Sequence, residues 1–357
     1  MLLHHPSSLL PILLLSLSHS AFSLASYDRA ECQYPSQDPL QGCPPNTILV
    51  GHNTGFSSIQ AAIFSINDTE APYTILIQPN NYTEQVNITR SAPLTLLGVT
   101  QHPNDATKNA VNIIWHNATG TNTTGSYDNA YTSTLTVSPT LNASLTGSGP
   151  TGNSVPEGTP FGNADFRAYN LNFWNKYLPY SAGPSLATGI SYANAGFYFC
   201  GVGSWQDTVY VGKLGSVYMY GSIVAGQTDF LYGFGTLWIE KSRLLLRSCG
   251  GGVTAWKGTN TTFENKYGVY IHDSDVVKAN SSLEIRHKCA LGRPWNAQHR
   301  SIFSGCYLDD SILPAGYIEW SASDPRVNYS EYSMDDDAAA AAACTDCGAR
   351  YNDGRIS

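Results

Sequence analysis

The sequence has few charged side chains. Asp, Glu, Lys and Arg make up only 13% of its 357 residues, the net charge is −8, and no long basic run occurs. Helical surfaces normally carry many Lys and Glu residues, so this shortage disfavours a helical protein. Because nucleic-acid-binding proteins need a basic surface, we expect no nucleic-acid partner.

Long apolar segments are also lacking beyond the N-terminus. Residues 9–17 are apolar apart from Ser16, and this run is too short to span a bilayer. Small residues follow, including residues 23–25. An apolar run followed by small residues predicts a secretory signal over residues 1–25, although no Lys or Arg precedes the run. No later segment is a membrane-spanning candidate. We therefore expect a secreted, soluble, monomeric chain with no membrane partner.

Cysteines and glycosylation motifs agree with export. The eight cysteines can pair completely, and Cys32 and Cys43 are expected to form a local disulfide. Cys289 with Cys306 is the second pairing considered. Residues 344–347 have the spacing of half a zinc site but no matching Cys or His cluster, so no metal or cofactor is expected. Nine Asn-x-Ser/Thr sequons begin at Asn67, Asn81, Asn87, Asn117, Asn122, Asn142, Asn260, Asn280 and Asn328.

A repeat of about 22 residues organises the middle of the chain. At this offset Asp207 aligns with Asp229, and the other aligned pairs are Tyr210 with Tyr232, Tyr198 with Tyr220 and Val202 with Val224. A fixed period of this length is typical of a solenoid in which one repeat forms one coil. The pattern predicts an all-β parallel β-helix, and a β-sandwich remains the alternative.

Short apolar runs between Gly, Asn and Ser residues supply the expected strands. We predict strands at residues 47–51, 73–78, 86–88, 94–98, 112–115, 166–173, 196–200, 216–220, 237–239, 244–246, 267–271 and 283–285. Residues 79–81 are predicted to form a turn, and residues 116–130 and 138–160 long loops that project from the coils. Residues 56–64 have apolar positions at helical spacing and include a Ser that can cap a helix. They predict a short helix that covers the N-terminal end of the solenoid.

These features divide the chain into four parts. The signal over residues 1–25 is followed by a Pro-rich arm over residues 26–46. Residues 47–334 are expected to form the β-helix domain. Residues 335–357, which begin with a run of three aspartates and six alanines, are expected to be a weakly ordered tail.

The aligned aspartates suggest chemistry. On successive coils of a β-solenoid, Asp207 and Asp229 would stack about 4.8 Å apart, the spacing between strands. Two carboxylates this close cannot both ionise easily, so one can serve as a nucleophile while the other holds a proton. The alternative is that both are ordinary turn residues, because Asp is common in turns.

Three ordered motifs resemble the pectin methylesterases, in particular the secreted fungal members. The motifs are Gln206-Asp207-Thr208, Asp229-Phe-Leu-Tyr-Gly233 and Leu291-Gly-Arg-Pro-Trp295. Tyr82-x-Glu84 matches a further family element, except that Asn80 stands where Gly is usual. The resemblance covers roughly residues 47–330. It implies a single-stranded right-handed parallel β-helix, methyl-esterified homogalacturonan (pectin) as the substrate, and methanol as a product.

The resemblance also implies roles for individual residues. Asp229 would be the nucleophile, and Asp207 the acid that protonates methanol and then activates water. Gln206 would donate to the oxyanion, Arg293 would hydrogen-bond the nucleophile, and Trp295 would be the platform for a sugar. Elementary chemistry agrees, because an Arg beside one aspartate keeps it ionised while its neighbour keeps a proton.

Some positions depart from the family pattern. Pro184 stands where a second oxyanion Gln is usual, and proline has no amide to offer. Trp256 and Gly258 occupy positions where the family often has Gln and Arg. Lys257 is expected to supply the positive charge instead, and with Phe230 and Trp256 it completes the expected substrate-binding residues.

Two other functions remain open at this stage. The same carboxylates could cleave the glycosidic bond, since retaining hydrolysis needs carboxyls about 5 to 5.5 Å apart. Alternatively, the chain could bind pectin without catalysis through Trp205, Trp256 and Trp295. A serine esterase is disfavoured because no Gly-x-Ser-x-Gly motif occurs. We interpret His272 as a rung or turn residue.

Overall fold

The computed structural model describes residues 28–67, 70–120, 127–147, 155–257, 267–296 and 299–320. The predicted signal, the predicted tail and the sequons at Asn122, Asn260 and Asn328 lie outside these residues. Among the helices of the described ranges, none has the length and apolar character needed to cross a membrane.

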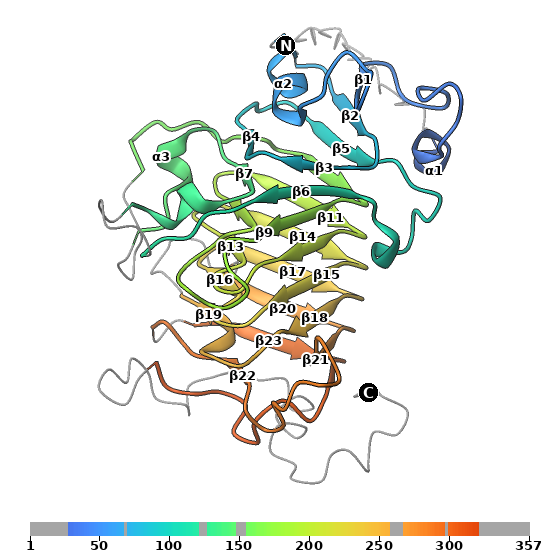
Figure 1. The fold of residues 1–357 in the computed structure, drawn as a ribbon. Helices are drawn as coiled ribbons and strands as arrows, with labels where there is room; N and C mark the ends of the chain where they lie inside the picture. The colour runs from blue at the N-terminus through green and yellow to red at the C-terminus, as the bar shows by residue number, and fades with distance from the viewer. Residues whose placement is uncertain are drawn as a thin grey trace, which may run out of the picture.

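The described strands stack into three parallel sheets, which run from the N-terminal end of the molecule to the C-terminal end in Figure 1. Sheet A contains β1 Thr47–Val50, β2 Tyr73–Ile77, β5 Leu94–Gly98, β8 Phe166–Tyr169, β11 Asn194–Tyr198, β14 Ser216–Tyr220, β17 Thr236–Glu240, β20 Gly268–His272 and β23 Ser301–Ser304. Sheet B contains β3 Asn80–Thr83, β6 Val111–Trp115, β9 Asn172–Asn175, β12 Gly201–Gly203, β15 Ile223–Gly226, β18 Arg243–Leu246, β21 Asp275–Lys278 and β24 Tyr307–Leu308. Sheet C contains β4 Val86–Ile88, β7 Leu135–Val137, β10 Thr188–Ile190, β13 Val209–Val211, β16 Leu231–Gly233, β19 Gly252–Trp256 and β22 Ala290–Gly292.

This arrangement is a right-handed parallel β-helix, and it confirms the predicted fold class. Among the described strands, each of the seven coils from β2 to β22 contributes one strand to each sheet. The predicted offset of 22 is the observed register, because Tyr198 pairs with Tyr220, Val202 with Val224 and Tyr210 with Tyr232. The period is visible in the sequence because equivalent positions on successive coils meet the same surroundings.

The interior is filled by rows of apolar side chains that run along the solenoid axis. In sheet A one buried row comprises Ile75, Leu96, Ala168, Phe197, Met219, Ile239, Ile271 and Phe303. Each large side chain in such a row contributes roughly 1.5–3 kcal/mol when it leaves water. This stacking fixes the register of every strand. It therefore also fixes where each turn between strands lies relative to the turns of the neighbouring coils.

The turn from sheet A to sheet B has the same form in the six coils from β8 to β24. One residue adopts a left-handed backbone, with φ between 45° and 60°. These residues are Asn170, Phe199, Gly221, Lys241, Asp273 and Gly305. The residue after each of them points inward, which creates a buried row of Leu171, Cys200, Ser222, Ser242, Ser274 and Cys306. In this row the Ser222 hydroxyl accepts from the backbone of Cys200, and the Ser242 hydroxyl from that of Ser222.

This row explains why the second predicted disulfide is wrong. Cys306 is a free cysteine in the buried row, and its thiol donates to the backbone carbonyl two residues earlier, that of Ser304. The Ser222 hydroxyl makes the same bond to the Tyr220 carbonyl in its own coil. Cys289 instead pairs with Cys249, 40 residues earlier. Cys200 is also free.

The N-terminal end is closed by α2, Ile59–Phe64, as predicted (Figure 1). The Ser58 side chain caps the helix by accepting from Ala61 N. Glu84, from the Tyr82-x-Glu84 motif, accepts from the backbone N–H groups of Ile59 and Gln60 at 2.9 and 3.0 Å. The motif carboxylate therefore has a structural role here, since it satisfies donors that a helix start leaves without partners.

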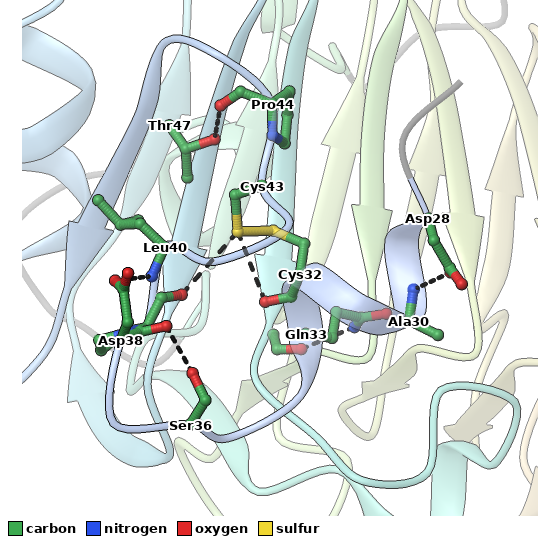
Figure 2. Close-up of a disulfide and its surroundings, with 12 residues drawn as sticks. Asp28, Ala30, Cys32, Gln33, Ser36, Asp38, Leu40, Cys43, Pro44 and Thr47 are labelled. Atoms are coloured by element: carbon green, nitrogen blue, oxygen red, sulfur yellow. Dashed lines mark hydrogen bonds between the residues drawn. A yellow bond between two sulfur atoms is a disulfide. The ribbon is translucent and has the colours of Figure 1, made fainter. Parts of the chain in front are cut away.

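The N-terminal arm contains a short helix, α1 Arg29–Gln33, which the sequence did not predict. Asp28 caps it by accepting from Ala30 N, and the predicted disulfide between Cys32 and Cys43 ties the arm into a loop, as Figure 2 shows. Cys32 is buried against β2 and β5 through Leu76 and Leu97. The arm is thereby fastened to the first coils.

Several further predictions differ from the structure. The strand predicted over residues 166–173 is divided by a turn at Asn170 into β8 of sheet A and β9 of sheet B. Strand β3 begins at Asn80, inside the predicted turn at residues 79–81. Residues 283–285 lie outside the strands. The loops carry η2 Asn129–Thr132 and α3 Leu141–Ser144, and a third single-turn helix, η1 Ala106–Lys108, precedes β6. Sequence periodicity fails at these positions because each element is too short to carry a pattern.

Candidate active site

The two predicted catalytic aspartates occupy the same turn on successive coils. Asp207 lies between β12 and β13, and Asp229 lies between β15 and β16, so both follow sheet B and precede sheet C. The preceding residues, Gln206 and Thr228, form a parallel bridge, and Asp207 N donates to Thr228 O at 3.0 Å. The predicted stacking of the two coils at this turn is therefore present.

Asp229 is held by three donors of two residues. Its Oδ1 accepts from Gly252 N at 3.1 Å and from Arg293 Nε at 2.8 Å, and its Oδ2 accepts from Arg293 Nη2. Only 4% of the residue is exposed. Burial raises the pKa of Asp229 above its usual value, and the hydrogen bonds and charge of Arg293 and the Gly252 amide limit that rise.

Asp207 has a different environment. It is 7% exposed, and the ion pair of Arg293 goes to Asp229 rather than to Asp207. Burial first, and then the charge of Asp229, raise the pKa of Asp207 well above its usual range, against the weaker effect of Arg293. The pair thus favours one ionised carboxylate, Asp229, beside one protonated carboxyl, Asp207.

Gln206 lies beside the pair with a fixed side-chain amide. Its Oε1 accepts from Ser181 Oγ at 2.8 Å, which orients Nε2 as the remaining donor. Ser185, on the preceding coil, donates its backbone N–H to Gln206 O. Pro184 precedes Ser185, and its carbonyl accepts from Thr119 N at 2.9 Å, so residues of the 116–130 loop lie over the place where an amide was expected.

Arg293 and Trp295 follow β22 on the same side of the site. The Arg293 guanidinium carbon lies 4.1 Å from the ring centroid of Trp320, whose ring lies 5.1 Å from that of Trp295. Trp295 and Trp320 are partly buried against a cluster that includes Tyr232. Sequence reasoning missed Trp320, because it follows the last strand and belongs to no repeat.

The other expected substrate-binding residues are in the interior. Trp256 and Phe230 have no exposed surface, and the Trp256 indole donates to Gly235 O at 3.2 Å. A side chain without exposed surface cannot stack on a sugar, so both serve as core residues. Lys257 is 1% exposed, and its Nζ lies 4.4 Å from the Trp295 ring centroid, within the range of a cation–π contact.

Two residues from the alternative interpretations are also placed. Trp205 is stacked by the Arg247 guanidinium, which lies 3.8 Å from its ring centroid. His272 ends β20 in sheet A, where it pairs in register with Glu240, so it is a rung residue remote from the aspartate turn. In the described residues no group of His, Cys, Asp and Glu side chains could hold a metal ion.

One neighbour of Asp207 was not predicted. Asn129, the first residue of η2, directs its side-chain Nδ2 to Asp207 Oδ2 at 3.4 Å. The two residues are 78 positions apart in the chain. No periodic or motif signal connects them, because Asn129 belongs to a loop outside the coils.

Comparisons with known proteins point to one family. A model of the pectinesterase family matches residues 152–344, more than half of the 357-residue chain. The chain is 27% identical over 316 residues to a probable pectinesterase A of Neosartorya fischeri, which covers 88% of this chain and 83% of that protein. It is 28% identical over 298 residues to a pectinesterase of Aspergillus niger, covering 81% and 80%.

Solved structures show the same fold. The pectin methylesterase of Aspergillus niger matches with a TM-score of 0.64 and 23% identity, covering 78% of this chain and 82% of that one. A mutant pectin methylesterase in complex with a hexasaccharide matches with a TM-score of 0.60 and 21% identity, covering 84% and 95%.

Proposed function

The chain belongs to the pectinesterase family, and from that premise we propose that Asp229 and Asp207 hydrolyse the C6 methyl esters of homogalacturonan. Family membership makes it a carboxylic ester hydrolase that demethylesterifies pectin. The hexasaccharide complex of a structural relative supports a polysaccharide substrate. The products are methanol and a galacturonate carboxylate.

In the first half of the proposed reaction, the ionised Asp229 carboxylate attacks the ester carbonyl. Arg293 and the Gly252 amide keep Asp229 ionised and aim it. The Nε2 group of Gln206 donates to the oxyanion, an interaction typically worth about 3 kcal/mol in the transition state. Collapse of the tetrahedral intermediate breaks the bond to the methoxy oxygen, which takes the proton of Asp207 and leaves as methanol.

In the second half, Asp207 is ionised and acts as the base. It removes a proton from water, which attacks the acyl intermediate, a mixed anhydride between the galacturonate and Asp229. Expulsion of the Asp229 carboxylate releases the product as a carboxylic acid, which then loses its proton to solvent, while the proton taken from water stays on Asp207. The pair is thus returned to the protonation state in which it began.

The observation that carries this proposal is the unequal environment of the two carboxyls. A nucleophile must be ionised and a leaving-group acid must be protonated, and the ion pair with Arg293 goes to Asp229. Trp295 and Trp320, partly buried beside Arg293, are suited to contact the apolar face of a sugar ring. A buried pair of this kind also argues against mere pectin binding, which needs no perturbed carboxyls.

The proposed location is extracellular, and the proposed state is a monomer. The predicted signal over residues 1–25 and the disulfides Cys32–Cys43 and Cys249–Cys289 support export, because disulfides persist in oxidising compartments. We keep residues 47–334 as the proposed catalytic domain.

One experiment separates the three candidate functions. Methanol and new reducing ends are both measured on esterified homogalacturonan with wild type and Asp229→Asn. We expect methanol without reducing ends for wild type, and loss of methanol with retained pectin binding for Asp229→Asn. Release of reducing ends would indicate a glycosidase, and absence of methanol from folded wild type would indicate a binding protein.

A further inference from the structure

The 116–130 loop brings a side-chain amide to the acid/base carboxyl. Asn129 Nδ2 lies 3.4 Å from Asp207 Oδ2, and among the described residues this is the only side-chain hydrogen bond made to the Asp207 carboxyl. The sequence predicted that this loop projects away from the coils. Instead, the described residues on both sides of positions 121–126 lie against the coils: Thr119 N donates to the carbonyl of Pro184, and Asn129 contacts Asp207.

The orientation of this amide is fixed by a second hydrogen bond. Thr119 Oγ donates to Asn129 Oδ1 at 2.7 Å, so the amide oxygen is occupied and the NH₂ group faces Asp207. Because Thr119 and Asn129 flank the same loop, the contact also closes the loop on itself. The amide is therefore held in place before any substrate binds.

The loop around Asn129 is anchored by its neighbour Asp128. The Asp128 carboxylate accepts from the backbone N–H groups of Ala130, Thr146 and Gly147 at 2.7 to 2.9 Å. Those bonds join η2 to the segment after α3. A side chain on so constrained a turn loses little freedom when it holds a catalytic group.

The charged and titratable groups facing Asp207 come from three directions. Asp229 lies on the next coil, Arg293 follows β22, and Tyr232 lies on β16. Burial first, and then the charge of Asp207, raise the pKa of Tyr232 well above its usual range, so this phenol stays neutral. An amide that donates to the ionised form of Asp207 opposes the effects of burial and of Asp229.

We propose that Asn129 is a positioning residue for the acid/base Asp207, and that its amide sets the pH at which Asp207 changes from acid to base. According to this proposal, the loop supplies a side-chain amide to the site. The coil supplies none, because it carries Pro184 at the position where a Gln was expected. The inference rests on the proposed function, in which Asp207 donates a proton to methanol and later removes one from water.

The test is the pH profile of kcat/KM for methanol release by Asn129→Ala and Asn129→Asp. Loss of the donor raises the pKa of Asp207, so the protonated acid persists to higher pH. We expect the alkaline limb of the profile to move up by about one pH unit in Asn129→Ala. It should move further in Asn129→Asp, because a second carboxylate adds repulsion. Near neutral pH, kcat should fall about tenfold or more while KM changes little.

Two additional variants separate positioning from loop stability. Thr119→Val keeps the shape but removes the hydroxyl that orients the amide, and it should move the limb in the same direction by a smaller amount. Tyr127→Phe removes hydrogen bonds to Asn117 and Ala118 elsewhere in the loop, and it should leave the limb in place. These two variants keep the proposal testable if Asn129→Ala folds poorly.

An alkaline limb that stays at the wild-type pH in Asn129→Ala, Asn129→Asp and Thr119→Val would overturn the proposal. That result is distinguishable from failure of the proposed function. In the first case wild type still releases methanol and Asp229→Asn does not, whereas in the second case wild type itself is inactive.

Discussion

Asp207 and Asp229 share a left-handed backbone conformation, with φ of 58° and 48°, at equivalent positions of successive coils. Such values are uncommon outside glycine, and Asp is among the residues that tolerate them best. The turn between sheets B and C therefore directs both carboxylates the same way. On the next coil a left-handed backbone recurs at Gly251, whose φ is 64°.

Gly251 is predicted to be irreplaceable for activity. A β-carbon there would lie 2.4 Å from Asp229 Oδ1 and 2.8 Å from Arg293 Nε, so it would displace the ion pair. We expect Gly251→Ala to reduce methanol release by about a hundredfold or more, because the nucleophile loses its orientation. Gly158→Ala is the matched control, since its φ is 76° and no atom lies within 4 Å of the added carbon. Equal activity of the two variants would refute the prediction.

Arg293→Lys should move the acidic limb of the pH profile. The lysine keeps a positive charge but cannot form the two-pronged contact with Asp229, so the pKa of Asp229 should rise. Because Asp229 must be ionised to attack, the acidic limb of kcat/KM should shift to higher pH by about one unit. Arg167, on β8, forms an exposed ion pair with Asp165, and Arg167→Lys is the control that should leave the profile unchanged. An unmoved acidic limb in Arg293→Lys would contradict this role.

His299 should make the fold sensitive to mild acid. Burial lowers its pKa from 6.5 to about 4, and its ring hydrogen-bonds Trp256 O and Ser301 Oγ. The unfolded chain takes up a proton below pH 6.5 whereas the folded chain does so only near pH 4. Stability is therefore lost as the pH falls through this window. The difference in Tm between pH 7 and pH 4.5 should shrink in His299→Gln and persist in the control His272→Gln. An unchanged difference in both would contradict the assignment.

The Cys249–Cys289 disulfide should contribute more to stability than either free cysteine. It fastens the turn that carries Gly251 to β22, so replacing both cysteines by serine should lower the free energy of unfolding by roughly 2–4 kcal/mol. Cys306→Ser should change it by less than about 1 kcal/mol, because serine already occupies the same position in three neighbouring coils. The measurement is denaturant unfolding, and a larger loss in Cys306→Ser than in the double variant would be the contrary outcome.

The coils and the aspartate pair were predictable from the sequence because both are local and periodic. Residues 22 positions apart have the same surroundings on successive coils. The same residue type therefore recurs at such positions, as in Tyr210 and Tyr232. The helix α2 was predictable for a related reason, since its cap and its apolar spacing lie within a few residues of each other.

Contacts made outside the repeat were not predictable in this way. Asn129 contacts Asp207 because its loop returns to the coils beside the aspartate turn, and no repeat encodes that return. The pairing of Cys289 with Cys249 depends on which turn residues face each other in space. The burial of Trp256 and Phe230 was also missed. An aromatic residue next to a motif has the same sequence signature whether it points into the core or toward a ligand.

The most direct test of the unequal aspartates is a leaving-group experiment with Asp207→Asn and Asp229→Asn. Trifluoroethoxide is a much weaker base than methoxide, so it can leave without a proton from Asp207 and then takes one from water. A trifluoroethyl-esterified homogalacturonan should therefore acylate Asp207→Asn. We expect a burst of up to one equivalent of trifluoroethanol from Asp207→Asn and none from Asp229→Asn, while both fail on the methyl ester. A burst from Asp229→Asn, or its absence from Asp207→Asn when that variant still binds pectin, would contradict the division of roles.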